Sequence, residues 1–483
     1  MSRYEPVIGL EVHAQIHTVS KMFCGCSVVE DTGDLPPNTY VCPVCTAMPG
    51  TLPVINCRAV ELTLMTGLAL HCEIPPIARF ARKSYFYPDL PKGYQISQHG
   101  LPLAVNGYLD IGTEAGSRRI GINNVHLEED TGKLYHVGNV SLVDFNRAGV
   151  PLIEIVSEPD MHSAEEVRTY AEALREILVY LGINSGDMEK GVMRFEASVS
   201  VRPEGSAELL SRHEIKNLNS FRALERAVSY EIVRQIEVLE SGGQVIQQTM
   251  GWDEMRGMTY VQRFKEYAED YRYFPEPDLP PLEVSQEWVE ELRNQLPELP
   301  VARRARFKAD YSLGAFETNL LVAEKEVADF YEEAVAAAEE ADAEAIAHWV
   351  TGEIFHQMKE ENLGIYDLHL PPERLAEIVD LVATDKITGG TAKEVVAEVR
   401  HTGQSPLEIV EQKGLVQISD EDALRKVVGQ VLTDHPDQVG QYLDGKGQVM
   451  GWLMGQVMRA TRGKANPQMA QKLLRGMLEE RRN

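Results

Sequence analysis

The stretch Ile8–Ile16, IGLEVHAQI, decides how the first half of the chain folds. Its apolar residues alternate with Glu11, His13 and Gln15. Successive side chains of a β-strand point to opposite faces of a sheet. We therefore predict a strand with one buried apolar face and one face that carries a carboxylate, an imidazole and an amide. Such a polar face lies either in bulk water or in a functional site.

The composition is typical of a globular protein with several domains. The chain has 483 residues, which suggests about two to four domains, and 43% of them are hydrophobic, enough to form cores. No run of about 18 apolar residues is present, so we predict no membrane span and no membrane partner. The first residues lack the charged and apolar regions of a signal peptide. We therefore predict a cytoplasmic protein.

The net charge of −27 excludes nucleic-acid binding through the overall field of the protein. Basic residues nevertheless collect near the C-terminus. They are Lys446, Arg459, Arg462, Lys464, Lys472, Arg475, Arg481 and Arg482, against Glu479 and Glu480. Two interpretations stay open: a local RNA-binding patch, or the solubilising faces of ordinary helices.

Four of the six cysteines lie close together in the sequence. Cys24 and Cys26 form a C-x-C pair, and Cys42 and Cys45 form a C-x-x-C pair. In a cytoplasmic protein this clustering indicates a metal site rather than disulfides. Two thiolate pairs suit a tetrahedral structural Zn²⁺. The alternative is four reduced thiols without a metal.

The sequence pattern changes near residue 297. Residues 1–296 alternate strand-like stretches with helices, so we predict an α+β cradle domain with a mixed or antiparallel sheet. Residues 297–410 are typical of an all-α helical domain, and residues 411–483 of a small all-α tail domain. The helices expected are 163–181, 220–240, 320–358 and 371–400, the last broken at Gly389 and Gly390.

Two further strand-like stretches carry carboxylates. One contains Glu128 with Glu129 beside it, and the other contains Glu154 between two isoleucines. Burying a lone carboxylate in so apolar a strand is costly unless it is paired or bound to a metal. The carboxylates of Glu11, Glu128 and Glu154, together with the imidazole of His13, suit a hard cation such as Mg²⁺.

A second group of residues is cationic or carries an amide. Arg82 and Lys83 lie in one stretch, and Lys216 and Asn217 precede the helix that begins near Ser220. A helix start of this kind favours anions, so Arg82, Lys216 and Asn217 are the expected contacts to a nucleotide. The sequence contains neither a phosphate loop nor a G-x-S-x-G nucleophile elbow. Any ATP chemistry therefore uses a site built from carboxylates and a metal.

Several longer motifs together resemble one family. They are Ile8–His13, Tyr85–Gln98, His126–Asp130, Pro151–Asp160, Glu214–Phe221 and Asp270–Leu279. These stretches resemble the B subunits of tRNA-dependent amidotransferases (GatB). Residues 415–420 and 463–467 resemble the YqeY-like tail of the same family. The resemblance runs nearly from end to end of the chain.

The resemblance implies a function as well as a fold. The family converts misacylated Glu-tRNA(Gln), and often Asp-tRNA(Asn), to the correct amide. The B subunit is expected to phosphorylate the side-chain carboxylate with ATP and Mg²⁺. A glutaminase A subunit supplies ammonia, a small C subunit joins both, and the tail domain is expected to bind the tRNA.

The resemblance also implies roles for single residues. Glu11, His13, Glu128 and Glu154 match the stretches that supply the Mg²⁺ ligands, with Glu129 as the open alternative to Glu128. Lys83 matches the ammonia path and is expected to be a catalytic or gating residue.

Two other classes of function stay open. One is a non-catalytic, tRNA-binding scaffold held by zinc, in which a partner does all the chemistry. The other is an independent Mg²⁺-dependent phosphotransferase for a small carboxylic acid. A scaffold gives no reason for Glu154 between two isoleucines, and the basic tail argues against a small substrate.

Overall fold

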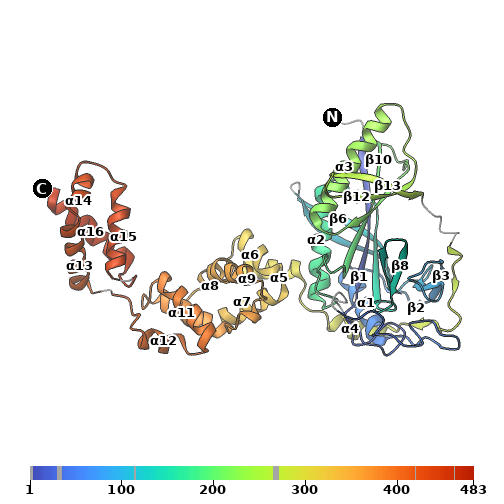
Figure 1. The fold of residues 1–483 in the computed structure, drawn as a ribbon, viewed down its shortest axis with the longest axis horizontal. Helices are drawn as coiled ribbons and strands as arrows, with labels where there is room; N and C mark the ends of the chain where they lie inside the picture. The colour runs from blue at the N-terminus through green and yellow to red at the C-terminus, as the bar shows by residue number, and fades with distance from the viewer. Residues whose placement is uncertain are drawn as a thin grey trace. The chain divides into compact units, whose positions relative to one another are not determined.

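The structure is a computed structural model that describes residues 4–29, 35–113, 116–264, 271–418, 420–461 and 463–482. The chain forms two compact units, residues 1–300 and 301–483 (Figure 1). The first unit holds a large sheet and the helices packed on it, and the second unit is built of helices. The predicted α+β fold class is confirmed. The finer boundary near residue 410 stays a prediction.

The large sheet of the first unit has the strand order β13-β12-β11-β10-β1-β9-β6-β5. Its strands are β1 (Tyr4–Gln15), β5 (Ala104–Thr113), β6 (Gly116–Glu129), β9 (Pro151–Ser157), β10 (Met193–Pro203), β11 (His213–Leu218), β12 (Gln248–Asp253) and β13 (Met258–Phe264). Among the described strands only β11 and β12 pair in parallel, so the sheet is mixed. The strand predicted from the opening stretch is β1, and it lies inside the sheet rather than at an edge.

Three smaller sheets complete the described strands of this unit. They are formed by β2 (Ile77–Ala78) with β15 (Leu282–Glu283), by β3 (Phe80–Ser84) with β4 (Tyr94–Gln98) and β14 (Phe274–Pro275), and by β7 (Lys133–Val137) with β8 (Val140–Asp144). Strand β3 carries two of the predicted site residues, Arg82 and Lys83.

Helices pack on one face of the large sheet and leave the other face polar. The helices of the first unit are α1 (Cys57–Ala69), α2 (Ala164–Tyr180), α3 (Phe221–Glu240) and α4 (Gln286–Asn294). Helices α2 and α3 begin where predicted, because Ser163 and Ser220 each accept a hydrogen bond from the backbone N–H three residues later. Their apolar residues share one core with the apolar face of β1. Glu11 and His13 therefore lie on the opposite face.

The second unit contains α5 (Pro300–Asp310), α6 (Ala315–Val322), α7 (Lys325–Ala337), α8 (Ala343–Trp349), α9 (Phe355–Glu361), α10 (Pro372–Ala383), α11 (Gly389–Thr402), α12 (Pro406–Gln412), α13 (Glu421–Asp434), α14 (Pro436–Leu443), α15 (Val449–Ala460) and α16 (Pro467–Arg482). The predicted break between 371 and 400 is present and lies at residues 384–388, because α11 begins at Gly389 with Thr388 as its cap. The helix expected over 320–358 is several shorter helices. Within the described ranges, no helix is long and apolar enough to cross a membrane.

A buried carboxylate ties α3 to the sheet. Glu231 has no exposed surface and accepts hydrogen bonds from His213 (2.5 Å), Thr259 (2.9 Å) and Gln235 (2.8 Å). Burial alone would raise the pKa of Glu231, but the bonds from His213, Arg234 and Gln235 lower it to about 2. The ionised carboxylate therefore stabilises the fold.

The Glu231→Gln variant should lose this contribution. Because the folded pKa lies below the ordinary value of 4.5, the contribution is fully present above that pH and is lost as the pH falls towards 2. We expect the free energy of unfolding at neutral pH to fall by about 3 kcal/mol. Urea denaturation followed by circular dichroism between pH 2 and 7 measures both effects. Glu237→Gln, exposed on the same helix, is the control and should leave the acid dependence unchanged.

Candidate functional site

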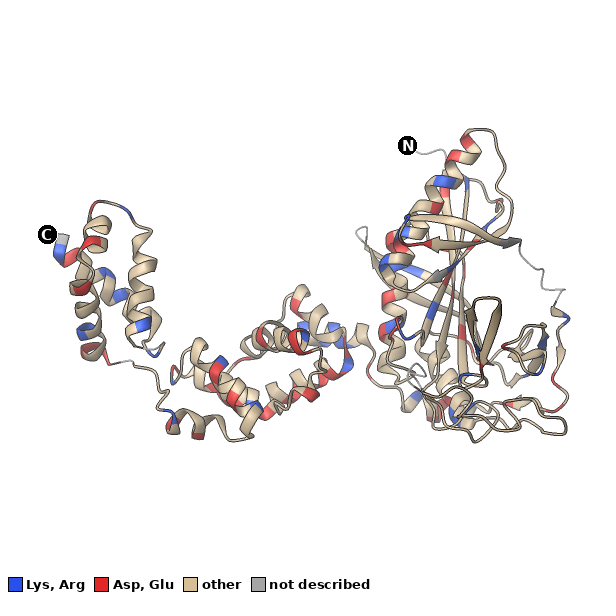
Figure 2. Ribbon diagram, in the orientation of Figure 1, with Lys and Arg blue, Asp and Glu red and all other residues tan. Residues whose placement is uncertain are grey.

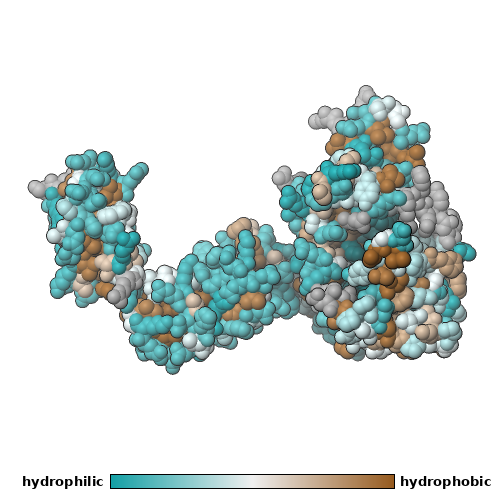
Figure 3. Space-filling view, viewed as in Figure 1, coloured by the Kyte–Doolittle hydropathy of each residue, from teal (hydrophilic) through white to brown (hydrophobic). Residues whose placement is uncertain are grey.

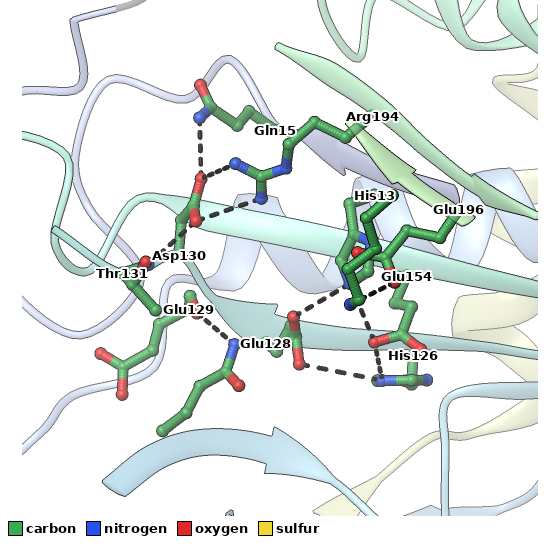
Figure 4. A network of polar contacts seen from close by, with 12 residues as sticks. His13, Gln15, His126, Glu128, Glu129, Asp130, Thr131, Glu154, Arg194 and Glu196 are labelled. Carbon is green, nitrogen blue, oxygen red and sulfur yellow. Dashed lines mark hydrogen bonds and ion pairs between the residues drawn. The ribbon is translucent and has the colours of Figure 1, made fainter. Parts of the chain in front are cut away.

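Four neighbouring strands place polar side chains in one row on the face opposite the core. The strand register pairs Arg194 of β10 with His13 of β1, His13 with Glu154 of β9, and Glu154 with His126 of β6. Residues paired across strands point to the same face. Figure 4 shows that the His13, Glu154 and His126 side chains converge.

Glu154 lies at the centre of this cluster. Its Oε2 is 3.2 Å from Nε2 of His13 and 3.3 Å from Nε2 of His126. Glu128 brings its Oε1 to 3.8 Å from Nε2 of His13. Glu128 is 2% exposed, and its Oε2 has no hydrogen-bond partner among the described residues. His13, Glu128 and Glu154 each offer one ligand atom, all within 4.8 Å of one another, so this group could hold a metal ion.

The charges in the cluster favour a cation. Burial lowers the pKa of His13, but the Glu154 and Glu128 carboxylates outweigh burial and raise it to about 9. Burial raises the pKa of Glu154, but the two imidazoles hold it well below its ordinary value. The site therefore stabilises positive charge next to the carboxylates, whether a proton or a metal ion carries it.

Glu11 lies one step further along the same face of β1. It faces Glu196 of β10. Burial, followed by the charges of Glu154, Glu196 and Glu214, raises the pKa of Glu11. Lys216 of β11 donates to Glu196 (2.6 Å) and Glu214 (3.0 Å). The structure thus brings Lys216 to this polar face but places Glu11 at the margin of the cluster.

Lys83 approaches the cluster from β3. Burial lowers its pKa, but the carboxylates of Glu128 and Glu154 outweigh burial and raise it above the ordinary value. Its Nζ lies 5.2 Å from the centre of the Tyr271 ring. Lys83 therefore adds a partly buried positive charge beside the two carboxylates.

Arg82 and Asn217 are not brought to the cluster by the described contacts. Arg82 pairs with Glu276 through two hydrogen bonds of 2.7 and 2.8 Å, and stacks 4.3 Å from the centre of the Tyr94 ring. It therefore joins β3 to the segment around Glu276. The backbone of Asn217 lies in β11, and its side chain is outside the described residues.

Glu129 points away from Glu128, because neighbouring residues of a strand alternate. It pairs with Lys92 (2.5 Å) and accepts a hydrogen bond from the backbone N–H of Ile96 (2.9 Å). Of the two alternatives left open by the sequence, Glu128 is the one that lies in the cluster.

A pocket of about 520 Å³ opens onto the cluster, a size typical of ligand sites. Its lining includes Lys83, His126 and Glu154, the side-chain amides of Gln98, Asn106, Asn123 and Asn124, and the rings of His99 and Tyr273. The two rings stack with centroids 4.1 Å apart. The pocket therefore offers charges, amides and a flat aromatic surface next to the two carboxylates.

Sequence reasoning missed three residues of this network. His126 belongs to the cluster, and Asp130 accepts hydrogen bonds from Arg194 (3.2 Å) and Gln15 (2.8 Å). These contacts direct the guanidinium of Arg194 at Asp130 (Figure 4), while the strand register pairs Arg194 with His13. Part of the signal was present in the sequence, because His126 and Glu128 flank the apolar Leu127 as His13 and Gln15 flank Ala14 in β1.

The four cysteines that were predicted to form a metal site lie together. The sulfur atoms of Cys24, Cys26, Cys42 and Cys45 are all within 4.8 Å of one another, and this group could hold a metal ion. A hydrogen bond from Cys24, with support from the nearby Lys21 charge, lowers the pKa of Cys45 to about 4 despite burial. Cys45 thus favours the thiolate, the form that binds metals, whereas the hydrogen bond to Cys45 raises the pKa of Cys24 and burial raises that of Cys26 to about 11.

The basic residues of the tail lie on helices that also carry acids (Figure 2). Lys472 and Arg475 are exposed on α16, with Glu479 and Glu480 further along. Lys464 donates to the carbonyl of Gly414 (2.6 Å). Arg462 and the side chain of Arg482 are outside the described residues. The exposed charge of this helix is therefore mixed rather than purely basic.

Comparison with known proteins gives matches over nearly the whole chain. Residues 6–290 match the GatB/GatE catalytic domain, and residues 329–478 match the GatB domain. The chain is 50% identical over 481 residues to the B subunit of the aspartyl/glutamyl-tRNA(Asn/Gln) amidotransferase of Thermomicrobium roseum, covering 99% of each chain. The B subunits of the same name from Moorella thermoacetica (50% over 479 residues; 98% and 100% covered) and Roseiflexus sp. strain RS-1 (52% over 476 residues; 98% and 97% covered) are similarly close.

Proposed function

Since the chain belongs to the GatB family of tRNA-dependent amidotransferase B subunits, we propose that the polar face of its sheet activates the misacylated amino acid. The substrate is the side-chain carboxylate of glutamate on tRNA(Gln), of aspartate on tRNA(Asn), or of both. ATP is the phosphoryl donor. The cluster of His13, His126, Glu128 and Glu154 marks the place where this carboxylate meets the γ-phosphate.

A carboxylate is a poor electrophile, so the reaction needs a leaving group. An oxygen of the substrate carboxylate attacks the γ-phosphorus, the bond to the bridging oxygen breaks, and ADP leaves. Ammonia from a glutaminase A subunit then attacks the acyl carbon of this acyl phosphate. Phosphate leaves, the nitrogen loses a proton, and the amide remains. A small C subunit completes the assembly.

The observation that carries this proposal is the buried Oε2 of Glu128, which lacks a hydrogen-bond partner among the described residues and lies 4.0 Å from Nε2 of His126, a residue that lines the open pocket. A buried carboxylate oxygen without a partner is costly, so a bound cation explains it. The carboxylates of Glu128 and Glu154, the imidazole of His13, and Glu11 at the margin fit a hard divalent cation and would hold Mg²⁺. When bound, Mg²⁺ offsets the charge of the phosphates.

The cationic side chains have separate roles in this scheme. Lys83, partly buried beside Glu128 and Glu154, neutralises the anionic substrate and lies on the side from which ammonia is proposed to enter. Lys216 and Asn217 of β11 contact the nucleotide. Arg82 donates two hydrogen bonds to Glu276. Its role is therefore to hold β3, and with it Lys83, in position.

The cysteine cluster is proposed to hold a structural Zn²⁺. Four sulfur atoms from two short pairs match the ligand set of a closed tetrahedral site. Such a site has no open coordination position, so it stabilises the fold rather than taking part in the reaction.

An exposed apolar surface supports the proposal that this chain is a subunit of a larger assembly. The β7–β8 hairpin exposes Tyr135, Val137, Val140 and Leu142 to solvent. Figure 3 shows the corresponding apolar area over this hairpin. Exposed apolar patches of this kind are typical of surfaces that a partner protein covers.

A single-turnover assay tests the proposed function. The purified chain, and then the assembled complex, are mixed with ATP, Mg²⁺ and [¹⁴C]Glu-tRNA(Gln), and ADP release is followed. Ammonia is then added and labelled Gln-tRNA(Gln) is measured. We expect ADP release that depends on misacylated tRNA, followed by amide formation. Absence of both in the complete complex would favour the scaffold function instead.

The tail domain is proposed to bind tRNA through the exposed side chains of Lys472 and Arg475. We expect the double variant Lys472→Glu/Arg475→Glu to raise KM for Glu-tRNA(Gln) about tenfold, because phosphate contacts dominate affinity. KM for ATP should stay unchanged. The matched control is Arg58→Glu/Lys190→Glu, which makes the same charge change at exposed positions of the first unit. An unchanged KM in the tail variant would refute tRNA binding by these residues.

A further inference from the structure

His126 faces both carboxylates of the cluster. Its Nε2 lies 3.3 Å from Oε2 of Glu154 and 4.0 Å from Oε2 of Glu128. The side chain is 11% exposed. Its other ring nitrogen, Nδ1, lies 2.8 Å from Oδ1 of Asn124. Which nitrogen carries the hydrogen decides what His126 can do at this site.

A chain of hydrogen bonds fixes this hydrogen. An ionised carboxylate only accepts, so the amide atom of Asn123 that lies 2.7 Å from Glu158 is its NH₂ group. The oxygen of Asn123 then faces Asn124 and accepts from the NH₂ group of Asn124 at 2.9 Å. The oxygen of Asn124 is therefore the atom that faces His126, and Nδ1 of His126 must be the N–H that donates to it.

An irregularity in strand pairing brings together the asparagines of this hydrogen-bond chain. The pairing of β6 with β9 shifts register between Ile122 and Asn124. A bulge of this kind lets consecutive side chains depart from strict alternation and is common beside active sites. It explains how Asn123 and Asn124, neighbours in sequence, come within hydrogen-bond distance of each other.

We propose that His126 is a further ligand of the cation held by His13, Glu128 and Glu154, and that Asn124 is the positioning residue that fixes its tautomer. With Nδ1 bearing the hydrogen, the lone pair on Nε2 points towards two carboxylates. A neutral imidazole and two carboxylates that face one space are stabilised by a cation between them, and an orienting hydrogen bond on the far nitrogen is the usual partner of a metal-bound imidazole. This inference rests on the proposed cation site.

Two imidazoles with two carboxylates form a ligand set that accepts Mn²⁺ well, whereas thiolates such as the cysteine cluster disfavour it. Mn²⁺ is therefore a suitable probe. We expect the full chain to bind Mn²⁺ at this site, measured by the loss of the free-ion signal in electron paramagnetic resonance. Pulsed measurements should detect two coupled imidazole nitrogens.

The variants separate ligation from positioning. His126→Gln should weaken Mn²⁺ binding at least tenfold and leave one coupled imidazole. Asn124→Ala should weaken it about tenfold, the usual effect of losing an orienting partner. Asn124→Asp keeps an acceptor for Nδ1–H and should restore affinity to within about threefold of the wild type, which a merely structural role would not predict. The control is His136→Gln, an exposed histidine of the β7–β8 hairpin, and circular dichroism checks that each variant folds.

Two outcomes would overturn the inference. One is wild-type Mn²⁺ affinity in both His126→Gln and Asn124→Ala, as expected if His126 is a protonated donor to Glu154. The other is a single coupled imidazole in the wild type. Either result would leave the proposed function intact if ADP is released. Two coupled imidazoles without tRNA-dependent ADP release would instead support the inference and refute the proposed function.

Discussion

Glu154→Gln should lower the single-turnover rate of tRNA-dependent ADP release at least a hundredfold. Glu154 contacts His13 and His126 through one oxygen, at 3.2 and 3.3 Å, so its charge organises the whole cluster. Glutamine keeps the size and the strand position but removes that charge. Losing one preorganised electrostatic contact typically costs about 10²–10³ in rate, and here the cation site is weakened as well.

The same variant has a second readout that does not depend on activity. Attraction to Glu154 is the main effect that raises the pKa of His13 to about 9 against burial. Removing the carboxylate should therefore lower this pKa below its ordinary value of 6.5, because burial then dominates. Titration of ¹⁵N-labelled histidine in the metal-free chain by nuclear magnetic resonance measures this change.

Asp110→Asn is the matched control for this experiment. Asp110 is an exposed carboxylate of β5 in the same sheet and pairs with Arg119 (2.8 Å). Its loss should leave both the rate and the pKa of His13 unchanged. A wild-type rate in Glu154→Gln would show that the reaction takes place elsewhere.

Local patterns of the sequence were enough to predict the strands and helix starts near the site. Strict alternation gave β1, and Ser163 and Ser220 marked the starts of α2 and α3 because their hydroxyl oxygens cap the first turn. The clustering of the four cysteines was likewise a local signal. Each of these features depends on residues that are close in sequence.

Which side chains form the cluster depends instead on how strands that are far apart in sequence pair with one another. That His13 faces Glu154 and Glu154 faces His126 follows from how β1, β9 and β6 pair, and no local pattern fixes that pairing. One step along β1 separates Glu11 from the cluster, and strand alternation separates Arg82 from Lys83. The bulge near Asn124, which orients His126, is equally invisible in the sequence. The sequence therefore indicates which strands carry the site, and the register decides which side chains meet.

The buried charge of Lys21 supports a metal at the cysteine cluster. Four thiolates around Zn²⁺ carry two negative charges, which need compensation when partly buried. Lys21 is 1% exposed, and its Nζ lies 3.7 Å from Sγ of Cys45 and 3.2 Å from the carbonyl oxygen of Phe145. The Cys45 thiolate faces this ammonium group, and further thiolates around a metal would add negative charge beside it. The lysine therefore fits a metal-bound, thiolate form of the cluster.

Cys45→Ser should consequently lose the metal and the local fold. We expect the wild-type chain to contain about one zinc per molecule by elemental analysis and the variant to contain less than about a tenth of that, because structural zinc is bound with about 10 kcal/mol or more in small zinc domains. The segment around Cys24 and Cys45 should become sensitive to proteases, and the chelator-treated wild type should behave in the same way. Cys57→Ser removes an exposed cysteine outside the cluster and should change neither zinc content nor protease resistance. A metal-free wild-type chain with full protease resistance would instead mean that four reduced thiols and Lys21 hold this segment without zinc.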